Sequence, residues 1–253
     1  MWRNRFRIEA SPQVFGFIVL LAALVAAGPA AAQEFSLDLG GEAGPLTGRI
    51  LQIIALVTVI ALAPSLLVVM TSFTRIVVVL SLLRSAMGVQ QTPPNVVIIG
   101  LALFLTGYVM APTFESAYQE GIVPLINDEI SEVEAFTRIS VPVHTFMLGQ
   151  VREKDLGLFL DLSGSELPSE PSTTPFRALI PAFLISELRR AFEIGFLLFI
   201  PFIIIDMVVA SVLMSMGMMM LPPILISLPF KLVFFVLVDG WNLVANSLVL
   251  SFG

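Results

Sequence analysis

The sequence predicts an all-α, membrane-associated protein. Its 253 residues are 57% hydrophobic and only 13% charged, whereas about a quarter of the residues in a soluble domain are charged. The mean hydropathy is +0.96. Four long apolar stretches carry this excess, at residues 50–70, 96–111, 192–213 and 232–250. Stretches of this length and composition are typical of helices that associate with a bilayer.

The first 32 residues have the three parts of a secretory signal peptide. Three arginines lie within the first seven residues, an apolar core runs over residues 14–27, and a small-residue segment ends in A-x-A at Ala32. We expect cleavage between Ala32 and Gln33, which places the mature N-terminus outside the membrane. The alternative, an uncleaved anchor helix, is disfavoured because Gly28-Pro29 breaks the helix before it reaches about 20 residues.

A linker over residues 33–49 and a first apolar helical hairpin over residues 50–113 are expected next. Arg75 and Arg84 lie between the first two apolar stretches with no acidic residue nearby, which indicates the cytoplasmic side. We expect both arginines to be buried polar residues.

Residues 114–176 are expected to form an acidic, mainly helical domain on the periplasmic side. Eleven acidic residues stand here against three basic ones. The Ser- and Pro-rich run over residues 163–175 predicts a loose exit from this domain. Helical patterning is seen at residues 114–120, 130–138 and 151–160.

Residues 177–253 are expected to form a C-terminal helical hairpin whose apolar stretches contain acidic residues. Asp206 and Asp239 are predicted to be buried polar residues, because an Asp exposed to lipid costs about 2.5 kcal/mol or more at a helix centre. Arg189 and Arg190 precede the third stretch on the side where positive charge is not expected. We therefore expect these segments to be buried in an assembly of several chains, rather than to form an isolated four-span bundle.

Glu187 and Lys231 are predicted to pair between neighbouring copies of the chain. Lys231 and Asp239 are separated by about 12 Å along a helix and cannot pair with each other directly, so each needs another partner if it is buried. The alternative is that Glu187 and Lys231 extend to a membrane interface.

Six of the eleven methionines lie between Met207 and Met220. Methionine is flexible and polarizable, so a ring of methionines can close around irregular shapes and reopen. The alternative is that these residues fill gaps in an apolar helix. We expect an exposed loop here, because Gly217 and the pair Pro222-Pro223 would end a helix. The residues of this loop and its supports are Met214, Met216, Gly217, Met218, Met219, Met220, Pro222 and Pro223.

No catalytic residue, metal site or cofactor is predicted. Cysteine is absent and His144 is the only histidine. The phosphate-loop, nucleophile-elbow and H-E-x-x-H motifs are all missing. The net charge of −6, with no basic stripe, gives nucleic-acid binding no electrostatic basis.

Several strings in the second half of the chain, with two upstream, resemble the FliP family of flagellar export-gate proteins, and the resemblance covers about residues 50–252. These strings are MTSFTRIVVVLSLLR (70–84), TPPN (92–95), FIPFIIIDMVVASVLM (199–214), GMMMLPP (217–223), LPFKL (228–232) and VLVDGW (236–241).

The resemblance implies helical hairpins in an oligomeric, cone-like export gate of the flagellar type III secretion apparatus. About five copies would assemble with FliQ, FliR and other export-apparatus membrane proteins in the basal body, at the bacterial inner membrane. Exported unfolded flagellar proteins would pass through the centre, and Met218, Met219 and Met220 would form a gasket that seals the pore.

Two alternatives remain at this point. The gate subunit of a virulence injectisome has similar strings, but it usually lacks a cleavable signal. An ion-coupled transporter would use Asp206 and Lys231 as ion or proton carriers, but it should show inverted repeats, and none is visible.

Overall fold

The computed structural model describes residues 53–54, 57–58, 61–62, 65–66, 68–89, 91–164, 170–218 and 220–253. The chain divides into two compact units, Met1–Ala55 and Leu56–Gly253, and all of the labelled helices belong to the second unit. The predicted cleavage site at Ala32 and Gln33, the linker and Met219 lie outside the described residues. The described part of the chain contains helices and no strand, which confirms the predicted all-α class.

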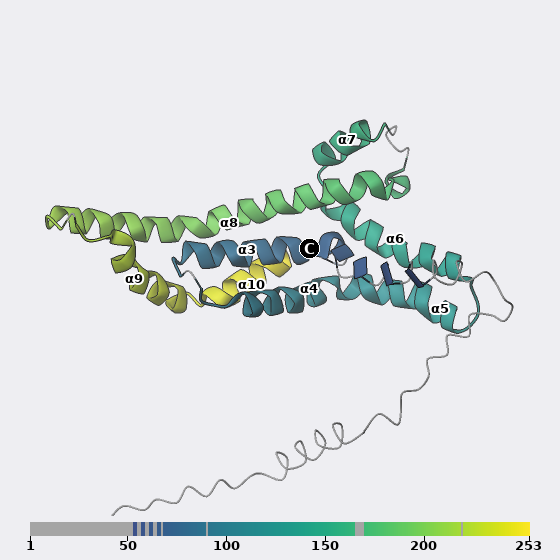
Figure 1. Ribbon diagram of the computed structural model, residues 1–253, viewed down its shortest axis with the longest axis horizontal. Coiled ribbons are helices and arrows are strands. Elements are labelled where there is room, and N and C mark those ends of the chain that lie inside the picture. The colour runs from purple at the N-terminus through teal and green to yellow at the C-terminus, as the bar shows by residue number, and fades with distance from the viewer. Residues whose placement is uncertain are drawn as a thin grey trace, which may run out of the picture. The chain divides into compact units, whose positions relative to one another are not determined.

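The described residues between 53 and 70 are helical, and the labelled helices come after them in the chain (Figure 1). In chain order these are α3 (Phe73–Ala86), α4 (Asn95–Ala117), the π-helix η2 (Tyr118–Ile122), α5 (Val123–Ile126), α6 (Glu132–Gln150), α7 (Glu153–Leu162), the 3-10 helix η3 (Pro171–Thr173), α8 (Phe176–Ser215), α9 (Pro223–Leu237) and α10 (Gly240–Leu250).

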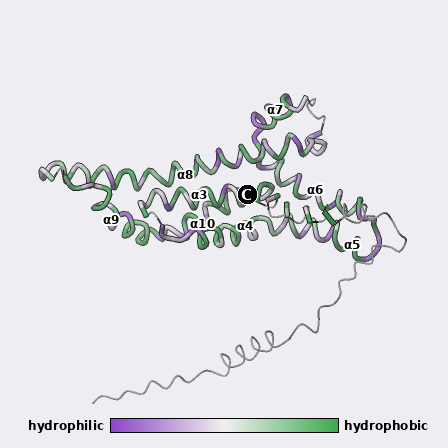
Figure 2. Tube along the Cα trace, in the orientation of Figure 1, coloured by the Kyte–Doolittle hydropathy of each residue, from purple (hydrophilic) through white to green (hydrophobic). Residues whose placement is uncertain are grey.

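Two of the described helical segments are long and apolar enough to cross a membrane, Asn95–Ile126 and α8. α9 and α10 together meet the same criteria but are bent by 64°. The tube along α8 and α9 is mostly hydrophobic (Figure 2). At 1.5 Å per residue the 40 residues of α8 reach about 60 Å, roughly twice the hydrocarbon thickness of a bilayer. One part of α8 must therefore lie outside the hydrocarbon if the other part spans it.

The start of α6 shows how local sequence sets a helix end. Ser131 is the N-cap, and its hydroxyl accepts a hydrogen bond from the backbone N–H of Glu134. Glu132 and Glu134 place negative charge in the first turn, next to the positive end of the helix dipole.

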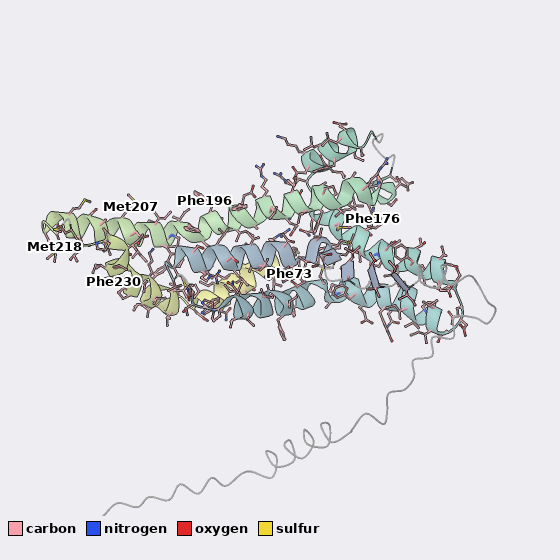
Figure 3. All side chains as sticks on the ribbon, viewed as in Figure 1. Phe73, Phe176, Phe196, Met207, Met218 and Phe230 are labelled. Carbon is pink, nitrogen blue, oxygen red and sulfur yellow. The ribbon has the colours of Figure 1, made fainter. Side chains whose placement is uncertain are left out.

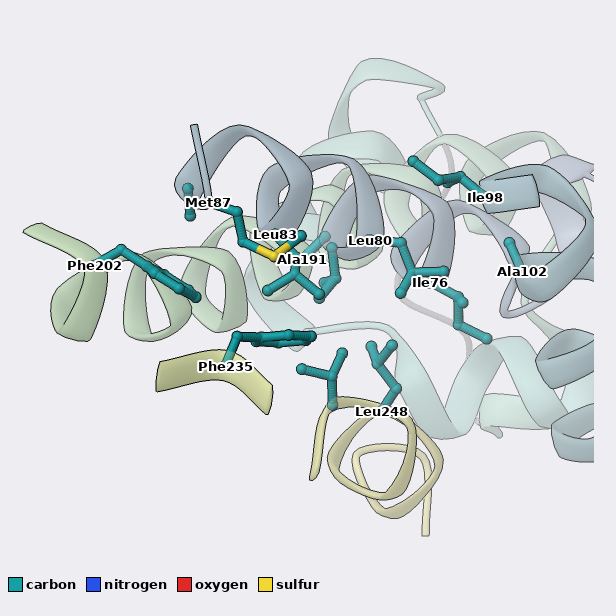
Figure 4. Close-up of a cluster of buried hydrophobic side chains, with 13 residues drawn as sticks. Ile76, Leu80, Leu83, Met87, Ile98, Ala102, Ala191, Phe202, Phe235 and Leu248 are labelled. Carbon is teal, nitrogen blue, oxygen red and sulfur yellow. The ribbon is translucent and has the colours of Figure 1, made fainter. Parts of the chain in front are cut away.

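The main core forms around α3, which packs against α8 and α4 (Figure 1). Ile76 and Leu83 of α3 share one buried cluster with Ala191 of α8. Phe235 of α9 and Leu248 of α10 lie on the opposite side of this cluster from α3 (Figure 4). A second, smaller core joins α6 to the first half of α8 through Met147, Leu179 and Phe183.

The bend between α9 and α10 depends on a glycine. Asp239 has a positive φ of 51°, and a Cβ on Gly240 would lie 2.2 Å from the Phe235 ring. That ring is held edge-on against Trp241, with centroids 5.3 Å apart. Gly240 is therefore required so that the bend can pack on Phe235.

We expect Gly240→Ala to cost about 1–3 kcal/mol of folding free energy, because the new methyl group overpacks the bend. The midpoint of thermal unfolding of the purified protein measures this loss. Gly107→Ala is the matched control, since nothing lies within 4 Å of its Cβ position in the middle of α4. Equal midpoints for the two variants would contradict the role given to Gly240.

Candidate functional site

The turn between α8 and α9 exposes a group of methionines, Met214, Met216, Met218 and Met220, here called the methionine tip. Their exposed fractions are 57%, 66%, 42% and 98%, so none of them is a core residue of this chain. Met218 is labelled at the end of α8, far from Phe176 at its start (Figure 3).

Backbone geometry turns the chain at this tip. Gly217 has a φ of +75° with open space around its Cα. The N–H of Gly217 donates to the carbonyl of Met214, and the N–H of Met218 to the carbonyl of Leu213, which is the Schellman pattern that ends helices. Pro222 then caps α9 and Pro223 is its first residue, where the missing N–H costs nothing.

A fully buried ion pair lies near the middle of the fold. Arg75 of α3 and Glu187 of α8 are both 0% exposed. The Nε of Arg75 donates to Oε2 of Glu187 at 2.9 Å, and its Nη2 donates to the other carboxylate oxygen. Nη2 also donates to Gln150 at 3.0 Å, and Nη1 donates to the carbonyl and hydroxyl of Ser251 at 2.8 and 3.0 Å. These five bonds match the five N–H groups of a guanidinium.

A second ion pair joins the two arms of the hairpin below the tip. The Nζ of Lys231 lies 2.6 Å from Oδ2 of Asp206 and donates to the carbonyl of Ala86 at 3.3 Å. The hydroxyl of Ser227 donates to the other carboxylate oxygen of Asp206 at 2.5 Å. Lys231 therefore ties α9 to α8 and to the end of α3.

These contacts correct the predicted pairing of Glu187 with Lys231. Each of the two residues has an oppositely charged partner within its own chain, Arg75 for Glu187 and Asp206 for Lys231. The pairing was predicted because each charge needed a partner if buried, and the fold supplies one to both.

The four residues predicted to be buried polar residues differ in how exposed they are. Arg75 is buried, and the side chain of Asp206 is 31% exposed. Arg84 is half-buried and donates to Asn95 at 2.6 Å, which links α3 to the start of α4. Asp239 lies at the bend between α9 and α10 and is exposed in the single chain, so its burial in an assembly stays a prediction.

Sequence reasoning missed a cluster that fastens α7 to α8. Arg152 donates to both carboxylate oxygens of Asp155 at 2.7 to 2.9 Å, and the hydroxyl of Ser186 donates to Asp155 at 2.6 Å. The spacing Arg-x-x-Asp at the start of an amphipathic helix was the available signal. Burial by itself raises the pKa of Asp155, but the hydrogen bonds from Ser186 and Arg152 and the charge of Arg152 outweigh it and lower the pKa.

We expect the contribution of Asp155 to stability to disappear in acid. A lowered pKa in the folded state stabilises the fold above the ordinary value of 3.8, and this stabilisation is lost as the pH falls through the lowered value. Asp155→Asn should therefore cost about 1.5–3 kcal/mol at neutral pH and progressively less below pH 3.8, measured by denaturant unfolding. Glu134→Gln, in the exposed pair with Arg138, is the control. A cost for Asp155→Asn that is the same at pH 7 and in strong acid would contradict the assignment.

No group of three or more His, Cys, Asp or Glu side chains suited to a metal ion occurs among the described residues. His144 is buried, and its Nε2 lies 2.7 Å from the carbonyl of Thr174. Its ring packs edge-on against Phe176, with centroids 5.0 Å apart. These contacts give the single histidine a structural role.

The sequence model of the FliP family matches residues 56–248. This chain belongs to the FliP family. Flagellar biosynthetic protein FliP of Caulobacter vibrioides is 62% identical over 237 residues, which cover 92% of this chain and 89% of that protein. The FliP protein of Bacillus subtilis is 54% identical over 201 residues, with 79% and 91% covered. That of Rhizobium meliloti is 48% identical over 237 residues, with 92% and 97% covered.

The matched FliP region contains the methionine tip, the buried Arg75–Glu187 pair and the partly exposed Lys231–Asp206 pair. The family resemblance seen in the sequence is confirmed. The injectisome and transporter alternatives are not favoured, because these relatives are all named as flagellar FliP proteins.

Proposed function

We propose that this chain is a core export-gate subunit of the flagellar type III secretion apparatus, located in the bacterial inner membrane within the flagellar basal body. Membership in the FliP family carries this proposal, because the relatives are named flagellar biosynthetic proteins. Two described segments long and apolar enough to span a membrane support a membrane location. The role is transport of unfolded flagellar proteins and not catalysis.

Assembly with other chains fits the surface of α8. Its large apolar residues Phe196, Leu197 and Met207 are 64–66% exposed in the single chain, and so large an apolar face needs cover from protein or lipid. We infer that about five copies of this chain, with FliQ, FliR and other export-apparatus membrane proteins, provide part of that cover.

The methionine tip supports a sealing role for Met218, Met219 and Met220. No Asp, Glu, Lys or Arg occurs between Asp206 and Lys231, so the hairpin end has no charge to attract ions. A narrow apolar constriction blocks ions because water does not wet it. Flexible methionine side chains can close such a constriction and still part for a passing chain.

We expect replacement of Met218, Met219 and Met220 together by Ala to raise ion leakage and slow growth while the complex still assembles. Because Met218 and Met220 are exposed, each of these two changes should alter stability by less than about 0.5 kcal/mol. Ion flux into cells or vesicles, measured with the amount of assembled complex, tests this.

Met207→Ala is the matched control, since Met207 is 65% exposed on α8 but lies away from the tip. Leakage should stay unchanged in this control. Failure of the triple variant to assemble, with no leakage, would instead identify the tip methionines as packing residues.

A further inference from the structure

The three residues after α10, Ser251–Gly253, contact α3 and α6 and are called the C-terminal strap. Ser251 accepts both hydrogen bonds that Nη1 of Arg75 donates. The carbonyl of Phe252 accepts a bond from Nε2 of Gln150 at 3.1 Å. The strap is therefore fixed by two side chains that lie more than 100 positions away in the sequence.

The Phe252 ring covers the arginine. The Cζ atom of Arg75 lies 3.7 Å from the ring centroid, a distance at which the cation is attracted to the face of the ring. The same ring stacks on Phe146 of α6, with centroids 6.3 Å apart and planes inclined by 23°. The Phe252 ring thus holds the strap through two contacts, with Arg75 and with Phe146, in addition to the hydrogen bonds of its own carbonyl and of Ser251.

Phe252 also borders open space. Together with Gly253, Tyr108 and Phe146 it lines a cavity of about 540 Å³ between α4, α6 and the end of α10. One residue thus both covers the guanidinium and forms part of a cavity wall. Its removal would leave Arg75 facing that cavity.

We propose that the C-terminal strap is a latch that completes the burial of Arg75 and holds α10 against α3. Among the described residues, Nη1 of Arg75 has no acceptor other than Ser251. A buried cation with two unmet donors is unfavourable, so the seated strap stabilises the Arg75–Glu187 pair. When the strap leaves, water reaches Arg75 and α10 loses its anchor beyond Leu250.

The absence of cysteine allows a direct test with single-cysteine variants of the full chain. Val244 is buried on the core side of α10, so the Val244→Cys variant reports on undocking of that helix. Deletion of Ser251–Gly253 should speed its reaction with a maleimide at least about tenfold, the change expected for lost hydrogen bonds to a charged group. Phe252→Leu, which retains apolar bulk but removes the ring, should give a smaller increase.

Leu160→Cys is the matched control, because Leu160 is buried on α7. Its reaction rate should be unchanged by either strap variant. The latch is refuted if the rate at position 244 changes by less than about twofold, or if the rate at position 160 rises as much, since that would indicate global unfolding. If the shortened chain does not fold, the reaction rates at positions 244 and 160 are compared between the Phe252→Leu variant and the chain with Phe252, and the same criteria apply.

Discussion

Replacing Arg75 by Met is expected to cost about 3–5 kcal/mol of folding free energy, the largest loss anticipated for any single change in this chain. Glu187 is 0% exposed and would lose the two hydrogen bonds and the charge that now balance it. A buried carboxylate without a partner is expensive because water cannot solvate it. Denaturant unfolding of the detergent-solubilised protein, followed by circular dichroism, measures the loss.

Two control variants show whether the loss of folding free energy comes from the unpaired charge or from the lost packing of the side chain. Arg138→Met removes a cation from an exposed pair with Glu134 and should cost less than about 1 kcal/mol. The double variant Arg75→Met with Glu187→Leu removes both buried charges and should recover much of the stability. If the double variant is as unstable as Arg75→Met, the cost comes from lost packing and not from the unpaired carboxylate.

Structural features that depend on residues close together in the sequence, such as helix ends, were predictable. Gly217 and the proline pair at 222–223 end one helix and begin the next because their own backbone restrictions require it. The exposed methionine loop results from these three residues and the apolar stretches on either side. The all-α class results from the same stretches, since isolated strands cannot satisfy their backbone groups in an apolar environment.

The charge partners were harder to predict, because they depend on which helices meet. Arg75 and Glu187 are 112 positions apart, and nothing local links them. One signal was present for Lys231. Asp206 precedes Met218 by twelve residues and Lys231 follows Met219 by twelve, so a hairpin that turns at this point brings the two charges opposite each other.

The length of α8 also depends on tertiary contacts. The third apolar stretch begins at Phe192, whereas α8 begins at Phe176, next to the expected start of the C-terminal hairpin at residue 177. The charged residues in the first half of α8 have polar partners, as Gln150 is for Arg190 at 2.9 Å. Arg189 pairs with Glu193 in the next turn at 2.8 Å. The two arginines that did not fit the expected membrane topology are thus held by contacts within the fold.

Lys231→Met is expected to cost about 2–4 kcal/mol, somewhat less than Arg75→Met. Lys231 is 4% exposed, and its loss leaves Asp206 with Ser227 as its one hydrogen-bond donor among the described residues. Because the Asp206 side chain is 31% exposed, water can solvate part of the stranded carboxylate, and the penalty is smaller than for a fully buried one. The lowered unfolding midpoint should be accompanied by reduced swimming through soft agar, since the pair holds α9 against α8 just below the methionine tip.

A neutral double variant tests whether motility needs the two charges themselves or only the contact between α8 and α9. Asp206→Asn with Lys231→Met removes both charges while keeping similar volumes, so it should restore most of the stability. Motility should return with stability if the pair serves only to hold the two arms together. A double variant that is stable but still immotile would show that the charges act during export itself. A double variant as unstable as Lys231→Met would show that the stranded Asp206 is not the source of the loss, because no unpaired charge remains to account for it.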